Sequence, residues 1–508
     1  MWRSLRHLIR LVEIGRCLSR ENALFLLERL PLPDLVLRLC RRLSNQKATG
    51  RPGQRLARAL QTLGPSFIKF GQSLATRADL FGERFATDLA ELQDRLPPFD
   101  AQTARDLIEA ELGEPLDQLF STFDDQPVAA ASIAQVHFAT TTEGEEVAVK
   151  VLRPGIERQM AADLDLFAWI ASWVEWLQPG FRRLRPSAAV ETFAASTRIE
   201  MDLRLEAAAA AELAENCADD PGFRVPRIDW RRTARRVLTL ERVEGLASDD
   251  REGLIDAGFD PDLVLQRAAE ILFKQVFRDG FFHADMHPGN MFIDDKGDMV
   301  PVDFGIMGRL DPATRRFLGE MLLGFLDADY KRVADVHFDA GYVPANQDKQ
   351  AFMQACRSIA EPIRDKPLSD ISIGRLLGQM FEVTETFAME TQPQLLLLQK
   401  TMVVAEGVGR KLNPNVNMWE LAQPLIESWM IDNLGPQAQI QTVIDDGIET
   451  IRRLPQLIER AERALESALD DGVKLDAGAW REGQTNLAPI GWTVLMITAG
   501  VILGALLS

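Results

Sequence analysis

The chain has 508 residues, of which 46% are hydrophobic and 26% charged, so it predicts a large globular protein of more than one domain and excludes a disordered chain. Its formal net charge of -18 argues against nucleic acid as a general partner. Its four widely spaced cysteines form no Cys-x-x-Cys pair, so we expect reduced thiols in a cytosolic setting, without a disulfide framework or a zinc site.

The start of the chain is basic although the whole protein is acidic. Residues 1–60 contain 13 Lys and Arg and four Asp and Glu, a net charge of +9, which leaves -27 for the rest. Arginines interrupt the apolar pattern of residues 3–16, which excludes a secretory signal peptide. The remaining apolar spacing predicts an amphipathic helix. That helix either lies on an anionic membrane or packs on its own domain, and both interpretations stay open.

The middle of the chain predicts a small β-containing lobe followed by a larger helical one. Residues 22–120 have a helical pattern, and the strand patterns that follow lie at 135–140, 146–152 and 236–241. Residues 157–216 are helical, and a linker at 244–245 precedes a mostly helical remainder. Two lobes of this kind, joined by a linker, resemble the plan of a protein kinase.

The stretch 283–305 carries the residue types that kinase-type phosphoryl transfer requires. Asp285 precedes Asn290 by five residues, and Asp303 opens an Asp-Phe-Gly 18 residues after Asp285. This set supplies one carboxylate beside the attacking oxygen, and an amide and a carboxylate that hold Mg²⁺ on the phosphates. Strand patterns on either side of a turn at 294–297 predict a hairpin that holds both metal ligands at one end.

Lys150 lies in the strand 146–152 and is the natural lysine to contact phosphates. Its ion-pair partner should be a helical acid, and Glu200, Asp202 and Glu206 are the candidates. On one continuous helix, Glu200 and Glu206 would be rotated by about 600° relative to each other, so we expect them to serve two different lysines.

The strand patterns at 135–140 and 146–152 flank a turn at 141–144 and predict a second hairpin. The loop before its first strand is rich in alanine where kinases place glycines. It comprises Ala129, Ala130, Ala131 and Ser132. Alanine keeps the side chain small but loses freedom at positive φ, so we expect altered nucleotide handling rather than lost binding.

The carboxyl-terminal part predicts a helix that begins at Asp311-Pro312, then a helical stalk, and finally an uncharged segment of 21 residues at 487–507. That length suffices to cross a bilayer core of about 30 Å. Gly500 and Gly504 form a Gly-x-x-x-Gly spacing that would let two such helices pack in a homodimer.

Taken together, these motifs resemble the UbiB family of atypical kinase-like proteins, also called the ABC1 or ADCK family, which is associated with ubiquinone biosynthesis. Lys69-Phe-Gly-Gln72 matches the family's Lys-x-Gly-Gln motif, Ala129–Ser132 its alanine-rich loop, Glu200-Met-Asp202 its Glu-x-Asp motif, and Asp285, Asn290 and Asp303 its catalytic and metal-binding loops. The resemblance covers about residues 60–430.

The resemblance implies an α+β fold: an atypical protein-kinase-like bilobed fold with an N-terminal helical extension and a C-terminal transmembrane helix. The expected parts are a basic helical segment (1–60), the Lys-x-Gly-Gln extension (61–120), an N-lobe with inserted helices (121–245), a helical C-lobe (246–430), a stalk (431–486) and the membrane helix (487–507). We expect a single-pass anchor in the bacterial inner membrane, with the catalytic domain in the cytoplasm.

The resemblance also implies the roles of individual residues toward ATP and Mg²⁺. The catalytic residue is Asp285, the metal ligands are Asn290 and Asp303, the nucleotide-binding residues are Ala129, Ala130, Ala131, Ser132, Lys150 and Glu206, and the gating residues are Lys69, Gln72, Glu200 and Asp202. It pairs Lys69 with the Glu-x-Asp acids and Lys150 with Glu206. Only a short segment follows Asp303 and no Ala-Pro-Glu follows it, which disfavours a docked protein substrate.

Three functions follow as hypotheses. The first is an ATPase or small-molecule kinase that supports ubiquinone biosynthesis by handling prenylated quinone precursors, with membrane lipid and the pathway enzymes as partners. The second is a scaffold that nucleotide binding alone controls. The third is a polyprenylphenol hydroxylase, whose support is an incomplete iron-binding triad of His283, Asp285 and His287; no flavin or nicotinamide fingerprint accompanies it.

Overall fold

The computed structural model describes residues 2–25, 47–75, 96–177, 186–362 and 393–415, with isolated positions at 85–92, 379–389 and 424–429. The chain divides into two units, Met1–Asp432 and Asn433–Ser508, and every described residue belongs to the first. The predicted stalk, the predicted membrane helix and the glycine pair Gly500 and Gly504 lie outside the described residues.

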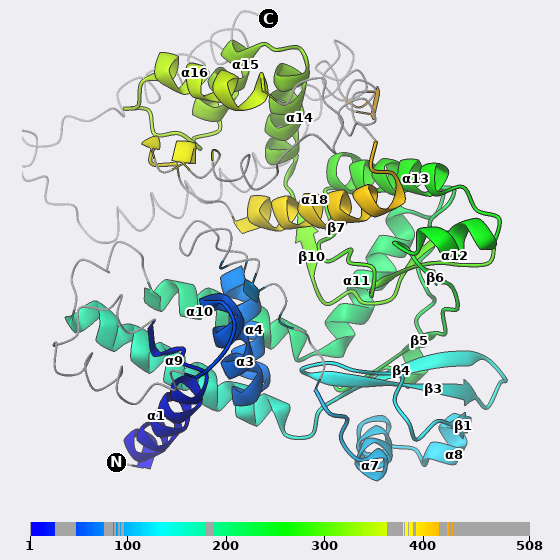
Figure 1. The fold of residues 1–508 in the computed structure, drawn as a ribbon. Helices are drawn as coiled ribbons and strands as arrows, with labels where there is room; N and C mark the ends of the chain where they lie inside the picture. Colours follow the sequence, from blue (N-terminus) through cyan, green and yellow to red (C-terminus); the bar gives the residue numbers. More distant parts are fainter. Residues whose placement is uncertain are drawn as a thin grey trace, which may run out of the picture. The chain divides into compact units, whose positions relative to one another are not determined.

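An antiparallel sheet forms the centre of the smaller lobe (Figure 1). Its strands are β1 (Phe120–Phe123), β2 (Ala129–Ala130), β3 (Ala134–Thr141), β4 (Glu146–Leu152) and β5 (Val237–Glu241). They run in the order β1-β3-β4-β5, with β2 paired to β3. The predicted hairpin of β3 and β4 is therefore present, and Gly144 supplies the positive φ of +90° that its turn requires.

Helices cover both faces of this sheet. One face packs against α7 (Ala101–Leu112) and α8 (Leu116–Leu119), and the other packs against α11 (Leu203–Asn216). On β4, Val149 packs in one cluster with Ile108 of α7, whereas Ala148 packs with Ala207 of α11. Side chains alternate along a strand, so Lys150 shares the face of Ala148. The strand period therefore directs Lys150 toward α11, which carries Glu206.

A second group of helices packs beside the sheet (Figure 1) and comprises α1 (Trp2–Arg20), α3 (Pro52–Leu63), α4 (Pro65–Ala75), α9 (Ile156–Leu177) and α10 (Pro186–Glu200). Phe67 of α4 meets Phe167 of α9 edge to face, with ring centroids 5.1 Å apart. Leu60 of α3 and Ala194 of α10 join the same buried cluster. This core fixes α4, and with it Lys69, relative to α10.

The basic first helix packs on its own protein. Arg10 Nε donates to Asp163 Oδ1 at 2.9 Å, and His7 Nε2 lies 2.9 Å from Asp165 Oδ2, so two acids of α9 neutralise this part of α1. The guanidinium of Arg10 also stacks on the Phe67 ring at 5.2 Å. Of the two interpretations left open by the sequence, the structure shows the packed helix.

The larger lobe is mainly helical and contains two small sheets. Its elements are β6 (Leu246–Ala247), α12 (Arg251–Asp256), α13 (Pro261–Phe273), η4 (Lys274–Asp279), β7 (Phe281–His283), β8 (Met291–Ile293), β9 (Met299–Pro301), β10 (Met307–Arg309), α14 (Pro312–Leu326), α15 (Tyr330–Asp339), α16 (Lys349–Ala360) and α18 (Pro393–Leu412). The predicted helix start is confirmed, because Asp311 Oδ1 accepts the Thr314 N–H at 2.9 Å and caps α14.

The predicted membrane anchor is not supported and is corrected here. In the part of the chain that the structure describes, no helix is both long enough and apolar enough to cross a membrane. The long helices carry charges: α9 contains Glu157 and Asp163, and α18 contains Lys400 and Glu406. The predicted segment 487–507 lies outside the described residues. The expected single-pass attachment to a bacterial inner membrane, with a cytoplasmic catalytic domain, is therefore withdrawn.

Candidate functional site

His283 fastens the catalytic loop to the Asp-Phe-Gly segment. Its ring is fully buried, its Nε2 lies 2.5 Å from the carbonyl oxygen of Asp303, and its Nδ1 accepts the backbone N–H of Asp285 at 3.2 Å. A carbonyl oxygen only accepts, so Nε2 carries the proton and the ring is the neutral tautomer. Burial, which lowers the pKa of His283, favours the same form. Both ring nitrogens are thus engaged, and the iron-triad interpretation loses His283 as a ligand.

His287 shapes the loop that follows Asp285. Its Nδ1 accepts the backbone N–H of Gly289 at 3.0 Å, which holds the ring against the turn. Its Nε2 stands 3.8 Å from Asp285 Oδ2, beyond hydrogen-bonding distance. His287 thus contacts the backbone of its own loop rather than the Asp285 carboxylate.

Asn290 and Asp303 stand at the same end of the β8–β9 hairpin, as predicted. Met291 pairs with Pro301, and the Val302 N–H donates to the Asn290 carbonyl at 3.0 Å, so the two candidate ligands flank the last rung. The amide nitrogen of Asn290 lies 3.4 Å from Asp285 Oδ2, which leaves the amide oxygen for a cation.

The side chain of Asp303 is suited to a magnesium ion. It is 42% exposed, and its Oδ1 accepts the Gly305 N–H at 3.0 Å. Loss of solvent opposes ionisation, but Lys150, the Gly305 N–H and the Lys69 charge together hold the pKa of Asp303 well below its usual range. No cluster of three or more His, Cys, Asp or Glu in the described residues could hold a metal. Asn290 and Asp303 nevertheless fit Mg²⁺, which takes a few protein oxygens and completes its shell with phosphates and water.

Lys150 joins the sheet of the smaller lobe to this hairpin. Its Nζ donates to Glu206 Oε1 at 2.6 Å and to Asp303 Oδ1 at 3.3 Å, and the N–H of Phe304 reaches the same Glu206 oxygen at 3.4 Å. Burial opposes the charge of Lys150, but the Asp303 and Glu206 carboxylates raise its pKa above the ordinary value. Burial raises the pKa of Glu206 to about 7, although the positive charge of Lys150 acts in the opposite direction.

Lys69 forms a second ion pair beside the first. Its Nζ lies 2.6 Å from Glu200 Oε2, with both side chains mostly buried, and Gln72 follows one turn later on α4. Asp202 accepts the Arg204 N–H at 3.2 Å to cap α11, and its side chain pairs with the Arg204 guanidinium. The assumption of one continuous helix was wrong, because α10 ends at Glu200 and α11 begins at Leu203. The break separates the two acids, which still serve two different lysines.

The alanine-rich loop forms a tight turn between β2 and β3, in which the Ala131 N–H donates to Ala134 O at 2.8 Å. Arg153 holds the loop through its Nη2, which donates to Ala131 O at 2.9 Å, a contact that the sequence did not suggest. Ser132 is fully buried, and its hydroxyl has no partner among the described residues. The nucleotide-binding role predicted for this loop therefore stays a prediction.

Lys400 is the site residue that the sequence did not reveal. It lies on α18, 115 positions after Asp285, and its Nζ donates to Asp285 Oδ1 at 2.7 Å. A single lysine in a helical pattern carries no local signal, because most such residues lie on a solvated surface. Only the packing of α18 onto the catalytic lobe brings the two side chains together.

Comparison with known proteins agrees with this geometry. Residues 91–337 match the family described as the ABC1 atypical kinase-like domain, and residues 356–417 match the UbiB helical domain. "Probable protein kinase UbiB" from Pseudomonas fluorescens strain SBW25 is 39% identical over 98% of this chain and 93% of its own length. The chain belongs to the UbiB family. A further UbiB relative, from Marinobacter nauticus, is 43% identical over 80% of this chain and 76% of the relative.

A solved structure shares the fold of this UbiB-family chain. Rv3197 from Mycobacterium tuberculosis, determined in complex with erythromycin, superposes with a TM-score of 0.52 and is 27% identical, covering 70% of this chain and 90% of that chain. In family terms, Asp285 belongs to the kinase-like domain and Lys400 to the UbiB helical domain. The ion pair between them therefore joins the two family domains at Asp285, the predicted catalytic residue.

Proposed function

We propose that this UbiB-family protein is an ATP-dependent phosphoryl-transfer enzyme, an ATPase or small-molecule kinase, that supports ubiquinone biosynthesis. The observation that carries the proposal is the contact of Lys150 with both Glu206 and Asp303, next to a catalytic loop that His283 ties to Asp303. A buried lysine (Lys150) that contacts both a buried carboxylate (Glu206) and a half-exposed one (Asp303) is typical of a functional site and unusual in an ordinary surface hairpin.

Each side chain has a separate task in this proposal. Asn290 and Asp303 hold Mg²⁺, which supplies positive charge on the phosphates, and Lys150 holds the nucleotide phosphates beside them. Asp285 orients the acceptor oxygen and takes its proton as that oxygen bonds to the γ-phosphorus. The bond to the ADP oxygen breaks, and its electron pair leaves with ADP.

Water or a small acceptor fits the site better than a protein. The segment after Asp303 runs directly into β10, which pairs with β7 through Met307 and His283, and then into the capped start of α14. A protein substrate of a kinase docks on a long activation segment, and this chain has no room for one between Asp303 and α14.

Phosphate release from ATP by the purified full-length protein tests the proposal. We expect Asp285→Asn to lower the rate about 100-fold, because a positioned general base contributes on the order of 10²–10⁴-fold. The exposed Asp295, in the turn of the same hairpin, provides a matched control, and Asp295→Asn should keep the wild-type rate. Nucleotide binding without any phosphate release would support a purely nucleotide-controlled scaffold, and an unaffected Asp285→Asn variant would remove Asp285 from the chemistry.

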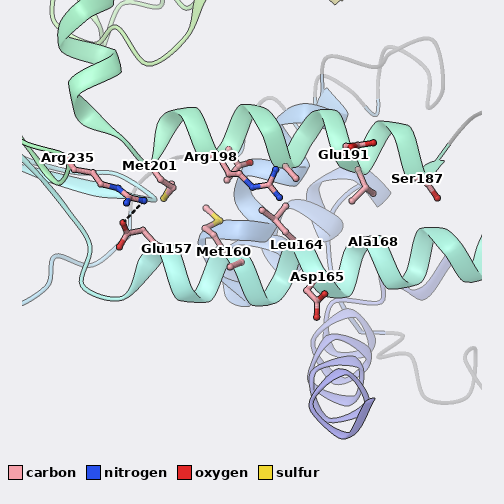
Figure 2. A pocket seen from close by; sticks show the side chains of 14 residues that line it. Glu157, Met160, Leu164, Asp165, Ala168, Ser187, Glu191, Arg198, Met201 and Arg235 are labelled. Carbon is pink, nitrogen blue, oxygen red and sulfur yellow. Dashed lines mark ion pairs between the residues drawn. The ribbon is translucent and has the colours of Figure 1, made fainter. Parts of the chain in front are cut away.

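A pocket between α9 and α10 supports a role in handling prenylated intermediates (Figure 2). Its volume is about 680 Å³, and Met160, Leu164 and Met201 contribute to its apolar lining. Met201 directly follows Glu200, the partner of Lys69, so a chain lodged there would act on the gating pair. An isoprenoid tail is apolar and flexible, which suits such a lining.

We expect Ala168→Trp to weaken the stimulation of phosphate release by a prenylated phenol in detergent. Ala168 lies on the exposed side of α9 and lines the pocket, so an indole there would occupy the space of the prenyl chain without disturbing the core. A loss of about 1.4 kcal/mol would raise the half-stimulating concentration about tenfold. Ala195→Trp, on an exposed face of α10 outside the lining, is the control. Equal stimulation in both variants would remove the pocket from the proposal.

A further inference from the structure

Helix α18 places the ammonium of Lys400 beside the carboxylate of Asp285. On α18, Leu397, Ala405 and Leu412 pack into the cluster that also contains Phe282 and Ala284 of the catalytic segment. These positions recur at helical spacing, so one apolar face of α18 packs into the core that also holds the segment carrying Asp285, with α13 and β10 as its neighbours.

Polar contacts secure the end of the same helix. Arg251 Nε donates to the Leu412 carbonyl at 3.0 Å, and Asn413 Nδ2 donates to Asp262 Oδ1 at 2.9 Å. With both its face and its end secured, α18 positions Lys400 in advance, which is the condition under which a charge contributes most to a transition state.

Lys400 is on the acceptor side of the proposed site, whereas Lys150 and Lys69 pair with carboxylates other than Asp285. The transferred phosphoryl group carries charge on three oxygens, and a positive group near the acceptor stabilises it. Lys150 already has two carboxylate partners, Glu206 and Asp303, and Lys69 pairs with Glu200. Lys400 lies 2.7 Å from Asp285 Oδ1, the carboxylate that takes the acceptor proton in the proposed function, and its side chain is 33% exposed.

His287, the basic side chain beside Asp285 on the same loop, is poorly placed for this role. His287 is two residues from Asp285, but its Nδ1 accepts an N–H bond and its Nε2 is 3.8 Å from the carboxylate. We therefore propose that Lys400 is a catalytic residue of this site, and that its ammonium contacts the transferred phosphoryl group on the acceptor side while it orients Asp285. This inference rests on the proposed phosphoryl-transfer function.

Two readouts on the full-length protein test the role of Lys400. In the first, Lys400→Met lowers phosphate release about 100-fold, the order of magnitude for removing one preorganised charge donor, and Lys400→Arg restores part of the rate. In the second, Lys400→Met weakens binding of the non-hydrolysable triphosphate AMP-PNP about tenfold, as expected for a lost charge-assisted hydrogen bond. ADP, which lacks the γ-phosphate, should bind with unchanged affinity.

The control is Lys411→Met on the same helix. Lys411 pairs with Asp249 at 2.6 Å but is 64% exposed and belongs to the outer surface, so both readouts should match the wild type. Faster phosphate release by Lys400→Met would show that the contact with Asp285 is inhibitory and would overturn the inference. Equal losses of AMP-PNP and ADP affinity would also overturn it. If wild-type protein releases no phosphate, the proposed function fails, while the AMP-PNP and ADP comparison still decides whether Lys400 contacts the γ-phosphate.

Discussion

If the proposed function holds, we expect Asp303→Asn to lower ATP turnover about 1,000-fold and to remove the dependence of nucleotide binding on Mg²⁺. The carboxylate is half exposed and is kept ionised by Lys150, the Gly305 N–H and Lys69. The neutral amide keeps the shape but loses the charge that binds a hard cation. Losing several kcal/mol of metal-dependent stabilisation corresponds to about three powers of ten in rate.

Fluorescent-nucleotide titrations with and without Mg²⁺, together with phosphate-release assays, measure both parts of this prediction. Asp295→Asn removes the same charge from the turn at the other end of the hairpin and should behave like the wild type. An Asp303→Asn variant that still binds nucleotide only with Mg²⁺, and turns it over at the wild-type rate, would remove Asp303 from the metal site.

Lys150→Met destabilises the fold by about 3 kcal/mol at pH 8 and by much less at pH 5. Removing one partner of a buried pair leaves the other charge uncompensated, and Glu206 is only 8% exposed. Burial already raises the pKa of Glu206 to about 7, and losing Lys150 raises it further. A carboxyl with a raised folded pKa stabilises the fold below its unfolded pKa of about 4.5, and this contribution is lost as the pH rises through the folded pKa.

Urea unfolding followed by tryptophan fluorescence at pH 5 and pH 8 measures this effect. The double variant Lys150→Met/Glu206→Leu should recover most of the stability at pH 8, because no buried charge is left unpaired. It should not recover turnover, since the phosphate-contacting lysine is gone. A Lys150→Met penalty of equal size at both pH values would show that lost packing, rather than the Glu206 charge, causes it.

Local sequence patterns predicted those parts of the site that lie within one hairpin or one helix start. Asn290 and Asp303 flank a short turn, so the strand pattern sufficed to place them at one end. Asp311 caps α14 because an aspartate before a proline favours that start.

Contacts between distant elements were beyond such patterns. The break between Glu200 and Leu203 was missed, because Met201 and Asp202 fit a continuous helix until Asp202 turns to cap the next one. The packing of the basic first helix depended on Asp163 and Asp165 of α9, about 150 positions later, which no local pattern connects to Arg10 and His7.

By itself, the sequence determined which side chains the candidate site can use: the spacing of Asp285, Asn290 and Asp303 and the strand lysine Lys150 predict a kinase-type site, because these side chains must be present for any fold to use them. Only the tertiary structure decided how the charges are shared. Packing brings Lys400 to Asp285 and places Lys150 between Glu206 and Asp303. These ion-pair partners are set by how helix faces pack against distant strands. That packing depends on the whole core, so no short stretch of residues predicts it.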